Sequence, residues 1–261
     1  MNPYLSGKKL YGEDLSPEEI SKWFADEKEG YYETTKIYES NRYSYHALNV
    51  EHGFRHLPQK TFYRVLGIGS ATGDEFAPIL HQCQNITILD PSEAMSNARF
   101  QYARPDKSGL LPFPDQSFDL IACLNVLHHI PKVSVSLKEI GRVLSPDGYA
   151  LISEPITSMG DWNHPRKGLT QNERGIPLQL FRSMVAMSGL RIYRESLHSF
   201  ALTSRWRYVI REAPYNTTWV VKLDRFLCRL PWFKSYHATG IKKLRATCVF
   251  FVVTSQKYHS K

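Results

Sequence analysis

The middle of this chain alternates short continuous apolar runs with stretches of helical periodicity. The apolar runs predict strands at 63–68, 86–89, 118–124 and 149–153, with a further candidate at 100–103. The periodic stretches between them predict helices at 74–82, 92–99 and 133–144. Continuous apolar runs are typical of strands buried on both faces, and alternation with helices favours a parallel sheet covered on both sides.

The first 60 residues show a different pattern, with no strand signal. Ser16-Pro17-Glu18-Glu19 is a typical helix start, and Ile20, Trp23 and Phe24 follow at helical spacing. A second helical stretch is predicted from Tyr31 towards Leu48. We therefore expect a helical cap over 1–60 before a sheet domain over 61–261.

Beyond residue 155 the pattern becomes irregular. The polar stretch 157–175 is long for a structureless connection, which favours a functional loop. A helix is expected at 177–188, ending before Gly189, whose lack of a side chain suits a left-handed cap. Strands are predicted at 190–193 and 247–254, with a basic segment inserted between them at about 195–246.

Charge is unevenly distributed along the 261 residues. The net charge is +8, yet the stretch from Arg191 onwards holds 14 Lys and Arg against three acids. Such asymmetry indicates an acidic substrate, a nucleic acid or a membrane surface, although a solvated basic surface is an equally good interpretation. The basic residues form no single run, which disfavours nucleic acid.

Composition narrows the class of protein. No apolar run reaches the roughly 18 residues of a membrane span, and the first residues lack the basic and apolar pattern of a leader. The four cysteines are scattered without a CxxC pair, which favours free buried thiols over disulfides or zinc. A cytoplasmic protein is the expectation.

Candidate chemistry begins at the first predicted strand. Val65-Leu66-Gly67-Ile68-Gly69-Ser70-Ala71-Thr72-Gly73 runs from a strand into a small-residue turn, and a second apolar run ends at Asp90. Such a turn lets a ligand approach the backbone, and an acid at the tip of the next strand can accept both hydroxyls of a ribose. The pairing predicts a nucleoside-containing cofactor.

Five segments then match one family in order. They are the Gly-rich turn, Leu89-Asp90-Pro91-Ser92-Glu93-Ala94-Met95, Leu111-Pro112-Phe113-Pro114-Asp115-Gln116-Ser117-Phe118-Asp119, Asn125-Val126-Leu127-His128-His129-Ile130, and the stretch Leu137 to Gly148. Over about 63–193 the chain resembles the class I S-adenosylmethionine-dependent methyltransferases, especially the small-molecule branch. The resemblance implies a Rossmann-like, doubly wound α/β fold with a seven-stranded, mostly parallel sheet whose last strand is antiparallel.

The resemblance also implies a cofactor, S-adenosyl-L-methionine, and a set of residues around it. Asp90 would bind the ribose hydroxyls, with Pro91 and Met95 near the adenine. Small residues would leave room beside the methionine and ribose, and Leu111 and Asn125 would line the pocket. The implied cofactor residues are Gly67, Gly69, Ser70, Ala71, Gly73, Asp90, Pro91, Met95, Leu111 and Asn125.

The chain departs from the family pattern at three positions. Gly67 stands where the family usually has an acid that orients the amino group of the cofactor, and Ala71 replaces the middle glycine. Lys107, beside Asp106, occupies the position of an acid that often contacts adenine. We expect Asp74 or Glu75 to replace the missing acid in part.

Methyl transfer needs an aligned nucleophile and, for a hydroxyl acceptor, a base. The base candidates are His128, His129 and His164, because the pKa of histidine lies near neutrality. Glu154 is a further candidate on the substrate side, as are Tyr43 and Tyr45, whose aromatic faces attract cations. Packing and hydrogen bonding are the more common roles of histidines and tyrosines in such positions. No cluster has metal-site spacing, so no metal is expected.

The absence of certain motifs narrows the class of molecule that could accept the methyl group. The motifs of nucleobase methylation, Asn/Asp-Pro-Pro-Tyr after the fourth strand or a Pro-Cys nucleophile, do not occur. The sequence favours transfer to an O or N atom of a small molecule, with an acidic or carrier-bound acceptor suggested by the basic tail. The alternatives are an RNA-modifying enzyme recruited through Arg205, Arg207, Arg211 and the lysines near Lys242, a non-catalytic scaffold, and an NAD-binding oxidoreductase. The oligomeric state is left open.

Overall fold

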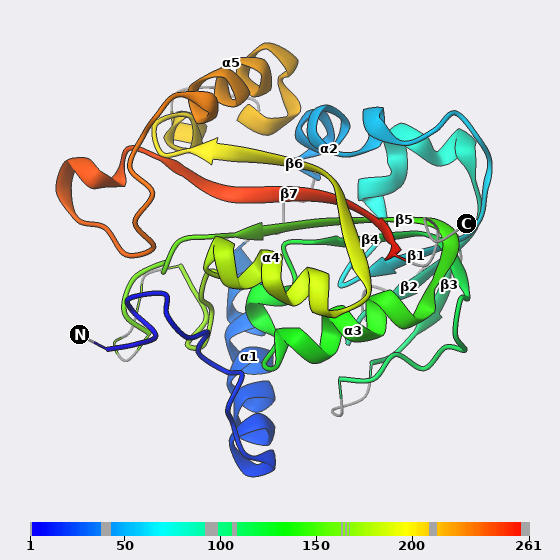
Figure 1. Cartoon of the computed structure of the whole chain (residues 1–261), viewed down its shortest axis with the longest axis horizontal. Coiled ribbons are helices and arrows are strands. Elements are labelled where there is room, and N and C mark those ends of the chain that lie inside the picture. Colours follow the sequence, from blue (N-terminus) through cyan, green and yellow to red (C-terminus); the bar gives the residue numbers. More distant parts are fainter. Residues whose placement is uncertain are drawn as a thin grey trace.

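The computed structural model describes residues 2–37, 43–91, 99–105, 109–162, 164, 166, 168–208 and 213–256. Seven strands form one sheet in the order β3-β2-β1-β4-β5-β7-β6 (Figure 1). The strands β1 to β5 are parallel, and β7 lies between β5 and β6 and runs antiparallel to both. Their bounds are β1 Phe62–Ile68, β2 Cys83–Leu89, β3 Gln101–Ala103, β4 Phe118–Leu124, β5 Leu144–Pro155, β6 Leu190–Phe200 and β7 Ala246–Ser255. The predicted sheet is confirmed.

Helices cover both faces of the sheet, as the apolar runs predict. In Figure 1, α3 and α4 lie below the sheet while α2 and α5 lie above it. The α-helices are α1 Pro17–Ile37, α2 His46–His52, α3 Val133–Val143, α4 Leu178–Met187 and α5 Thr218–Arg229. Short 3₁₀ helices are η1 Phe54–His56, η2 Asp74–Gln82, η4 Leu127–His129, η5 Thr203–Tyr208, η6 Pro214–Asn216 and η7 Gly240–Lys243.

Alternate side chains of the central strands enter two separate hydrophobic cores. In β7, Phe251 packs in the core under α3 and α4, whereas Phe250 packs in the core under α2, η2 and α5. The same alternation separates Leu66 from Val65 in β1. Because successive side chains point to opposite faces, a strand buried on both sides must be apolar at every position.

The N-terminal region is helical, and part of it belongs to the sheet's core. Ser16 and Glu19 form a capping box, in which each backbone N–H is bonded by the other side chain. The first helical stretch and the start of the second, at Tyr31, form one helix, α1, which continues to Ile37. The side chains of Leu48 and Phe54, from α2 and η1, lie in the same core as α5. The predicted domain boundary near residue 60 stays a prediction.

Two local features differ from the pattern. The segment 74–82, predicted as an ordinary helix, is a 3₁₀ helix, and Pro78 within it lacks the N–H that a regular helix uses. The strand predicted at 190–193 continues to Phe200, so the basic insert spans 201–245. Gly189 has the expected left-handed backbone, with φ of 71°. The predicted helix at 92–99 lies mostly outside the described residues.

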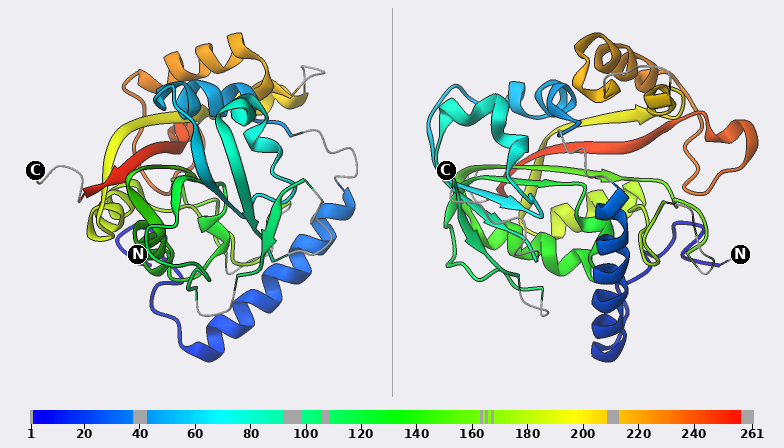
Figure 2. Two further views of the ribbon diagram at one scale, coloured as in Figure 1. Left: turned by 90° about the vertical axis from the view of Figure 1, so that its right-hand side faces the viewer. Right: turned by 180° about the vertical axis from the view of Figure 1, so that it is seen from behind.

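The insert contains η5, η6, α5 and η7. It joins the body through Asp224, whose carboxylate accepts hydrogen bonds from the backbone N–H of Ser199 and Phe200 and from the Thr203 hydroxyl. In all views α5 lies on the opposite side of the molecule from α1, which projects from the body (Figure 2). No helix among the described residues combines the length and apolar character needed to cross a membrane.

Candidate active site

The site lies between β1 and β4, where the connections that follow these two neighbouring strands run in opposite directions. In the order β3-β2-β1-β4, the chain after β1 crosses to β2 on one side and the chain after β4 crosses to β5 on the other. Such a switch point opens a crevice at the carboxyl ends of the strands, where open α/β sheets bind ligands. The Gly69 N–H bonds to the Leu89 carbonyl at 2.8 Å and fixes the start of the turn there.

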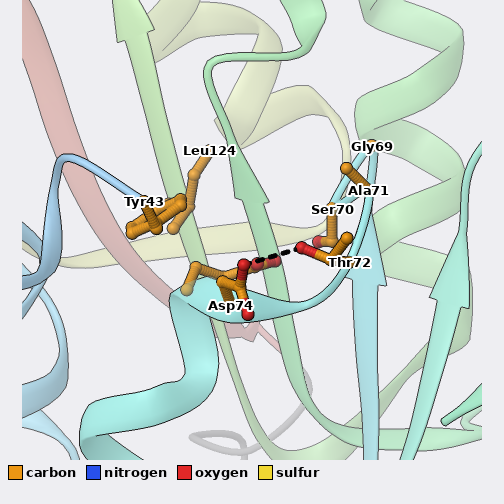
Figure 3. A pocket seen from close by; sticks show the side chains of 8 residues that line it. Tyr43, Gly69, Ser70, Ala71, Thr72, Asp74 and Leu124 are labelled. Carbon is orange, nitrogen blue, oxygen red and sulfur yellow. Dashed lines mark hydrogen bonds between the residues drawn. The ribbon is translucent and has the colours of Figure 1, made fainter. Parts of the chain in front are cut away.

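A cavity of about 120 Å³ occupies this crevice. Most of its wall comes from the turn after β1 and the first residues of η2, with Tyr43 and Leu124 facing them (Figure 3). The lining residues are Tyr43, Gly69, Ser70, Ala71, Thr72, Asp74, Glu75 and Leu124. Most ligand pockets measure roughly 300–1,000 Å³. The described cavity therefore matches one part of a nucleoside-sized ligand.

The turn itself depends on left-handed backbone. Gly69, Ala71 and Gly73 all have positive φ, of 61°, 48° and 75°. A side chain at Gly69 would meet Val126, and one at Gly73 would meet the Phe100 ring. Glycine adopts this conformation without strain, whereas the Cβ of Ala71 makes it sterically unfavourable.

Asp90 closes the turn from the tip of β2. Its carboxylate is buried and accepts the Ala71 N–H at 3.0 Å. The bond holds the acid against the Gly-rich turn, where a cofactor ribose is expected. Asp90 thus both shapes the turn and places a negative charge beside the cavity.

The cavity is acidic, since Asp74 and Glu75 both line it and no arginine or lysine among the described residues does. The Thr72 hydroxyl donates to Asp74 at 2.9 Å. Glu75 is 4% exposed, and burial raises the pKa of its carboxyl to about 7 even though the Ser70 hydroxyl bonds to it. A positively charged ligand would be stabilised here, and it would favour the ionised form of Glu75.

Of the predicted tyrosines, Tyr43 lines the cavity and Tyr45 does not. The Tyr43 hydroxyl accepts a hydrogen bond from the Asn49 side chain at 2.7 Å, and burial raises the pKa of this phenol. The Tyr45 ring packs edge-on against Tyr43 and stacks on Tyr215. Asn216 donates its side-chain N–H to the Tyr43 carbonyl at 2.7 Å, so the insert holds this wall.

Glu154 is fully buried and binds the turn after β4. Its carboxylate accepts the backbone N–H groups of Val126, Leu127 and His128 at 2.8, 2.7 and 3.2 Å. The same carboxylate lies 2.7 Å from His128 Nδ1. With its oxygens engaged in this way, Glu154 orients the turn rather than facing an acceptor.

His128 lies between two carboxylates. Burial alone lowers the pKa of His128, but Glu154 and Glu173 outweigh burial and raise this pKa to about 9. A histidine that is protonated at neutral pH is a poor general base. Among the three predicted histidines, His128 is thus best suited to a structural or electrostatic role.

His129 and His164 have different surroundings. His129 Nδ1 lies 2.9 Å from the Glu27 carboxylate of α1, and its side chain is about one-third exposed. His164 is 80% exposed, with Asp161 at 3.9 Å. None of the three histidines lines the described cavity. His129, half-buried and oriented by a carboxylate, is the better placed base candidate of these two.

The same turn offers a possible set of metal ligands. Within the described chain, His128, His129 and Glu173 bring ligand atoms within 4.8 Å of one another. Two imidazoles and a carboxylate fit zinc. Nδ1 of each histidine already faces a carboxylate here, so hydrogen bonding accounts for the cluster as well. The expectation that no metal is needed stays a prediction.

Comparison with known proteins covers this region. Residues 66–152 match the family model described as a methyltransferase domain. An uncharacterized methyltransferase, YcgJ of Bacillus subtilis, is 32% identical over 103 residues, covering 34% of this chain and 40% of that protein. A fatty-acid O-methyltransferase of Mycolicibacterium smegmatis is 36% identical over 81 residues, covering 28% and 29%. The chain thus spans less than half the length of these relatives.

A solved structure extends the likeness to the whole fold. The chain solved with the Haloferax volcanii Trm112 methyltransferase activator has a TM-score of 0.54 and 14% identity. The alignment covers 91% of this chain and 97% of that one. Residues 66–152 of the present chain therefore match the methyltransferase domain family in sequence, and the chain as a whole shares the fold of that solved structure.

The methyltransferase family's missing acid has a structural explanation. A side chain at Gly67 would lie 2.4 Å from Ser70 Oγ and 2.9 Å from the Phe76 ring, so Ser70 fills the space that the family's acid would need. Ser70 in turn bonds to Glu75, whose carboxyl lines the cavity. An acid thus lines the cavity eight positions further along the chain, and its replacement of the family's acid stays a prediction.

The cavity fits the cofactor that the family implies. S-adenosylmethionine carries a sulfonium and an ammonium group, and the lining acids Asp74 and Glu75 match these charges. A dinucleotide brings a pyrophosphate to the same turn in other Rossmann-like proteins, and these acids would repel it. Asp90 lies against the same turn through its bond with the Ala71 N–H, and its contact with a ribose stays a prediction.

Among the described residues, the remaining cofactor positions implied by the resemblance do not line the cavity. The Leu111 N–H bonds to Glu139 at 2.9 Å, and Asn125 has a left-handed backbone, with φ of 60°, and an N–H bonded to Ser153. Neither residue lines the described cavity, and neither does the exposed Pro91. Met95, Asp106 and Lys107 lie outside the described residues, so these predictions stay predictions.

Three residues near the methyltransferase site carry no signal in the sequence. Arg174 is fully buried and donates to the carbonyls of Tyr11, Leu127, His128 and Ile130. Glu27 joins α1 to His129 and to Thr170, and Asn216 holds Tyr43. Each acts over a long sequence separation, which no local pattern could indicate.

Proposed function

We propose that this chain transfers the methyl group of S-adenosylmethionine to an O or N atom of an acidic small molecule. The observation that carries the proposal is the acidic cavity at the Gly-rich turn, which suits a cationic cofactor. When bound, S-adenosylmethionine supplies a methyl group on a sulfonium, which is an excellent leaving group. The protein is then required mainly to bind and orient the acceptor.

The cofactor would be held by the residues around the turn. Asp90 would accept the ribose hydroxyls, Glu75 and Asp74 would face the ammonium group, and the Tyr43 ring would lie beside the sulfonium. Aromatic faces attract cations, which supports the role of Tyr43. Ser70 would position Glu75 by the bond between their side chains.

Two features support an acidic acceptor. A carboxylate oxygen is already a nucleophile and needs no base, and none of the candidate histidines reaches the described cavity. The similarity to a fatty-acid O-methyltransferase also favours an acid, although it covers only 28% of this chain. For a hydroxyl acceptor, His129 would be the base, held by Glu27.

Calorimetric titration with S-adenosylmethionine and S-adenosylhomocysteine tests the cofactor. We expect binding in the micromolar range, lost in Asp90→Ala and strongly weakened in Asp90→Asn. The Asn variant keeps an acceptor for the Ala71 N–H, so its loss of affinity reports on the charge rather than on a collapsed turn. NADH serves as the control ligand and should not bind.

Turnover tests the acceptor. Incubation with methyl-labelled S-adenosylmethionine and panels of carboxylic acids, phenols and amines should label an acid most strongly. A well-folded chain that binds neither cofactor nor product would contradict the proposal and favour the non-catalytic scaffold. Binding with labelling of RNA alone would favour the RNA-modifying alternative.

A further inference from the structure

The insert between β6 and β7 carries an apolar surface that no described part of the chain covers. Six of the eleven large hydrophobic side chains that are exposed in the described structure belong to it. We call these six residues the insert surface: Leu202, Trp219, Phe226, Leu230, Phe233 and Ile241. Trp219 and Phe226 are 58% and 59% exposed, which is unusual for side chains of this size.

The α5 helix displays part of this surface as one face. Trp219, Lys222, Phe226 and Arg229 follow at intervals of three or four residues, so they lie on the same side of the helix. The opposite side buries Val220, Val221, Asp224 and Cys228 against the body. Trp206 of η5 meets Trp219 with ring centroids 5.8 Å apart, which extends the surface beyond the helix.

Basic residues surround these apolar side chains. The segment 201–245 holds ten Lys and Arg against two acids, which equals the net charge of the entire chain. Lys222, Arg229, Lys234, Lys242 and Lys243 are exposed, and none of them has a carboxylate partner among the described residues. The insert surface therefore combines hydrocarbon with uncompensated positive charge.

The surface is held in place. Asp224 binds the end of β6, and Arg225 pairs with Glu51 of α2. Three residues before Trp219, Asn216 bonds to the Tyr43 carbonyl and accepts the His46 N–H. The insert surface is thus rigidly connected to a wall of the cofactor cavity.

We infer that the insert surface docks on a membrane that carries anionic lipids. Interfacial protein segments bury Trp, Phe and Leu at the boundary between headgroups and acyl chains, and Lys and Arg add electrostatic attraction to anionic lipids. Each basic residue near an anionic surface adds about 1 kcal/mol. The aliphatic Leu202, Leu230 and Ile241 favour hydrocarbon over nucleic acid, where aromatic side chains stack on bases. Lysine is depleted from the cores of protein interfaces, which disfavours a protein partner.

Flotation with lipid vesicles tests this inference without turnover, so its outcome is separate from that of the proposed function. The probes are vesicles of phosphatidylcholine alone and vesicles with about 30% phosphatidylserine, an anionic lipid of the kind that attracts polybasic surfaces. We expect at least tenfold more protein on the anionic vesicles at low salt, a loss as salt rises, and a blue shift of tryptophan emission.

Two sets of variants assign the binding to the insert surface. Trp219→Ser/Phe226→Ser and Lys222→Gln/Arg229→Gln/Lys234→Gln should each reduce vesicle binding tenfold or more. Tyr63→Ser/Met187→Ser, which removes exposed large side chains outside the insert, should change it less than twofold. Circular dichroism and S-adenosylhomocysteine binding show that each variant is folded.

Equal, weak binding to both vesicle types would overturn the inference. So would unchanged vesicle binding in the Trp219→Ser/Phe226→Ser variant. Retention of a single-stranded RNA oligonucleotide, lost with the three basic residues and accompanied by no vesicle binding, would assign the surface to nucleic acid instead.

Discussion

Single residues in the turn after β1 decide how closely a ligand can approach the backbone. Gly69 and Gly73 adopt left-handed backbone without strain, and their hydrogens leave room for Val126 and Phe100. Ala71 adopts the same conformation with a methyl group attached, and Asp90 bonds its N–H. Ala71 therefore has a strained backbone, which the hydrogen bond to Asp90 stabilises.

Ala71→Gly should relieve that strain. Left-handed backbone costs a non-glycine residue about 1–2 kcal/mol, and the greater freedom of glycine in the unfolded chain returns about 0.4–1 kcal/mol of this. We expect a net gain of roughly 0.5–1 kcal/mol in the free energy of unfolding, measured by urea denaturation. Ala150→Gly, in the buried strand β5, is the matched control and should lose roughly 1 kcal/mol. A loss of stability in both variants would show that Ala71 is unstrained.

Glu75 should make stability and cofactor binding depend on pH. Its pKa rises from 4.5 to about 7 on folding, so the protonated carboxyl contributes stability that is full below pH 4.5 and lost as pH rises through 7. The contribution is on the order of 3 kcal/mol, at about 1.4 kcal/mol for each pKa unit. Glu75→Gln should remove this dependence in urea denaturation between pH 5 and 7.5.

The same carboxyl must ionise to bind the ammonium group of the cofactor. Affinity for S-adenosylhomocysteine should therefore rise several-fold between pH 6 and 7.5 in the wild type and stay flat in Glu75→Gln. The Glu75→Gln/Asp74→Asn double variant should bind still more weakly. Normal binding by that double variant would refute the replacement of the family's acid by these two residues.

At the scale of elements, the turn after β4 is built around one buried carboxylate. Glu154, at the end of β5, accepts three backbone N–H groups of the turn that contains η4 and pairs with His128. Arg174 bonds the carbonyls of the same turn from the other side. Three N–H groups and three carbonyls of the turn are thus bonded by side chains from distant parts of the chain.

Glu154→Gln should be strongly destabilising. An amide in place of the carboxylate brings a donor N–H against backbone donors and leaves His128⁺ with Glu173 alone. Removing one partner of a buried ion pair costs about 3–5 kcal/mol. Thermal or urea unfolding measures the loss. The same substitution at the exposed Glu19 in the capping box should cost less than about 0.5 kcal/mol. A small effect at both positions would show that water replaces the carboxylate.

The elements were largely predictable because their signals are local. Phe118–Leu124 is apolar except for Asp119 because its two sides face the two cores, and Ser16-Pro17 marks the start of α1 by capping. The ends of strands were harder to predict from the sequence. The strand β6 continues to Phe200 through polar residues that pair with β7. The contacts of Glu27, Arg174 and Asn216 join residues more than 40 positions apart, and no spacing along the chain encodes them.

At the scale of the whole molecule, the cofactor site joins segments that are far apart in the sequence. The Gly-rich turn follows β1, Asp90 follows β2, and Tyr43 precedes α2 and is held by the insert. A ligand that contacts all of them stabilises their common arrangement. Free Cys83, Cys123, Cys228 and Cys248 provide no covalent link between these parts, as the sequence predicts.

Ligand binding should accordingly raise the unfolding temperature of the entire chain. Saturation at 100 times the dissociation constant adds about 2.7 kcal/mol to the folded state. For a chain of this size each kcal/mol shifts the midpoint by about 2–4 °C, so S-adenosylhomocysteine should raise it by roughly 5–10 °C in differential scanning fluorimetry. Asp90→Asn should lose most of this shift, because it lacks the charge that faces the ribose. NADH should give none, since Asp74 and Glu75 repel its pyrophosphate; a shift with NADH and none with S-adenosylhomocysteine would reverse the cofactor assignment.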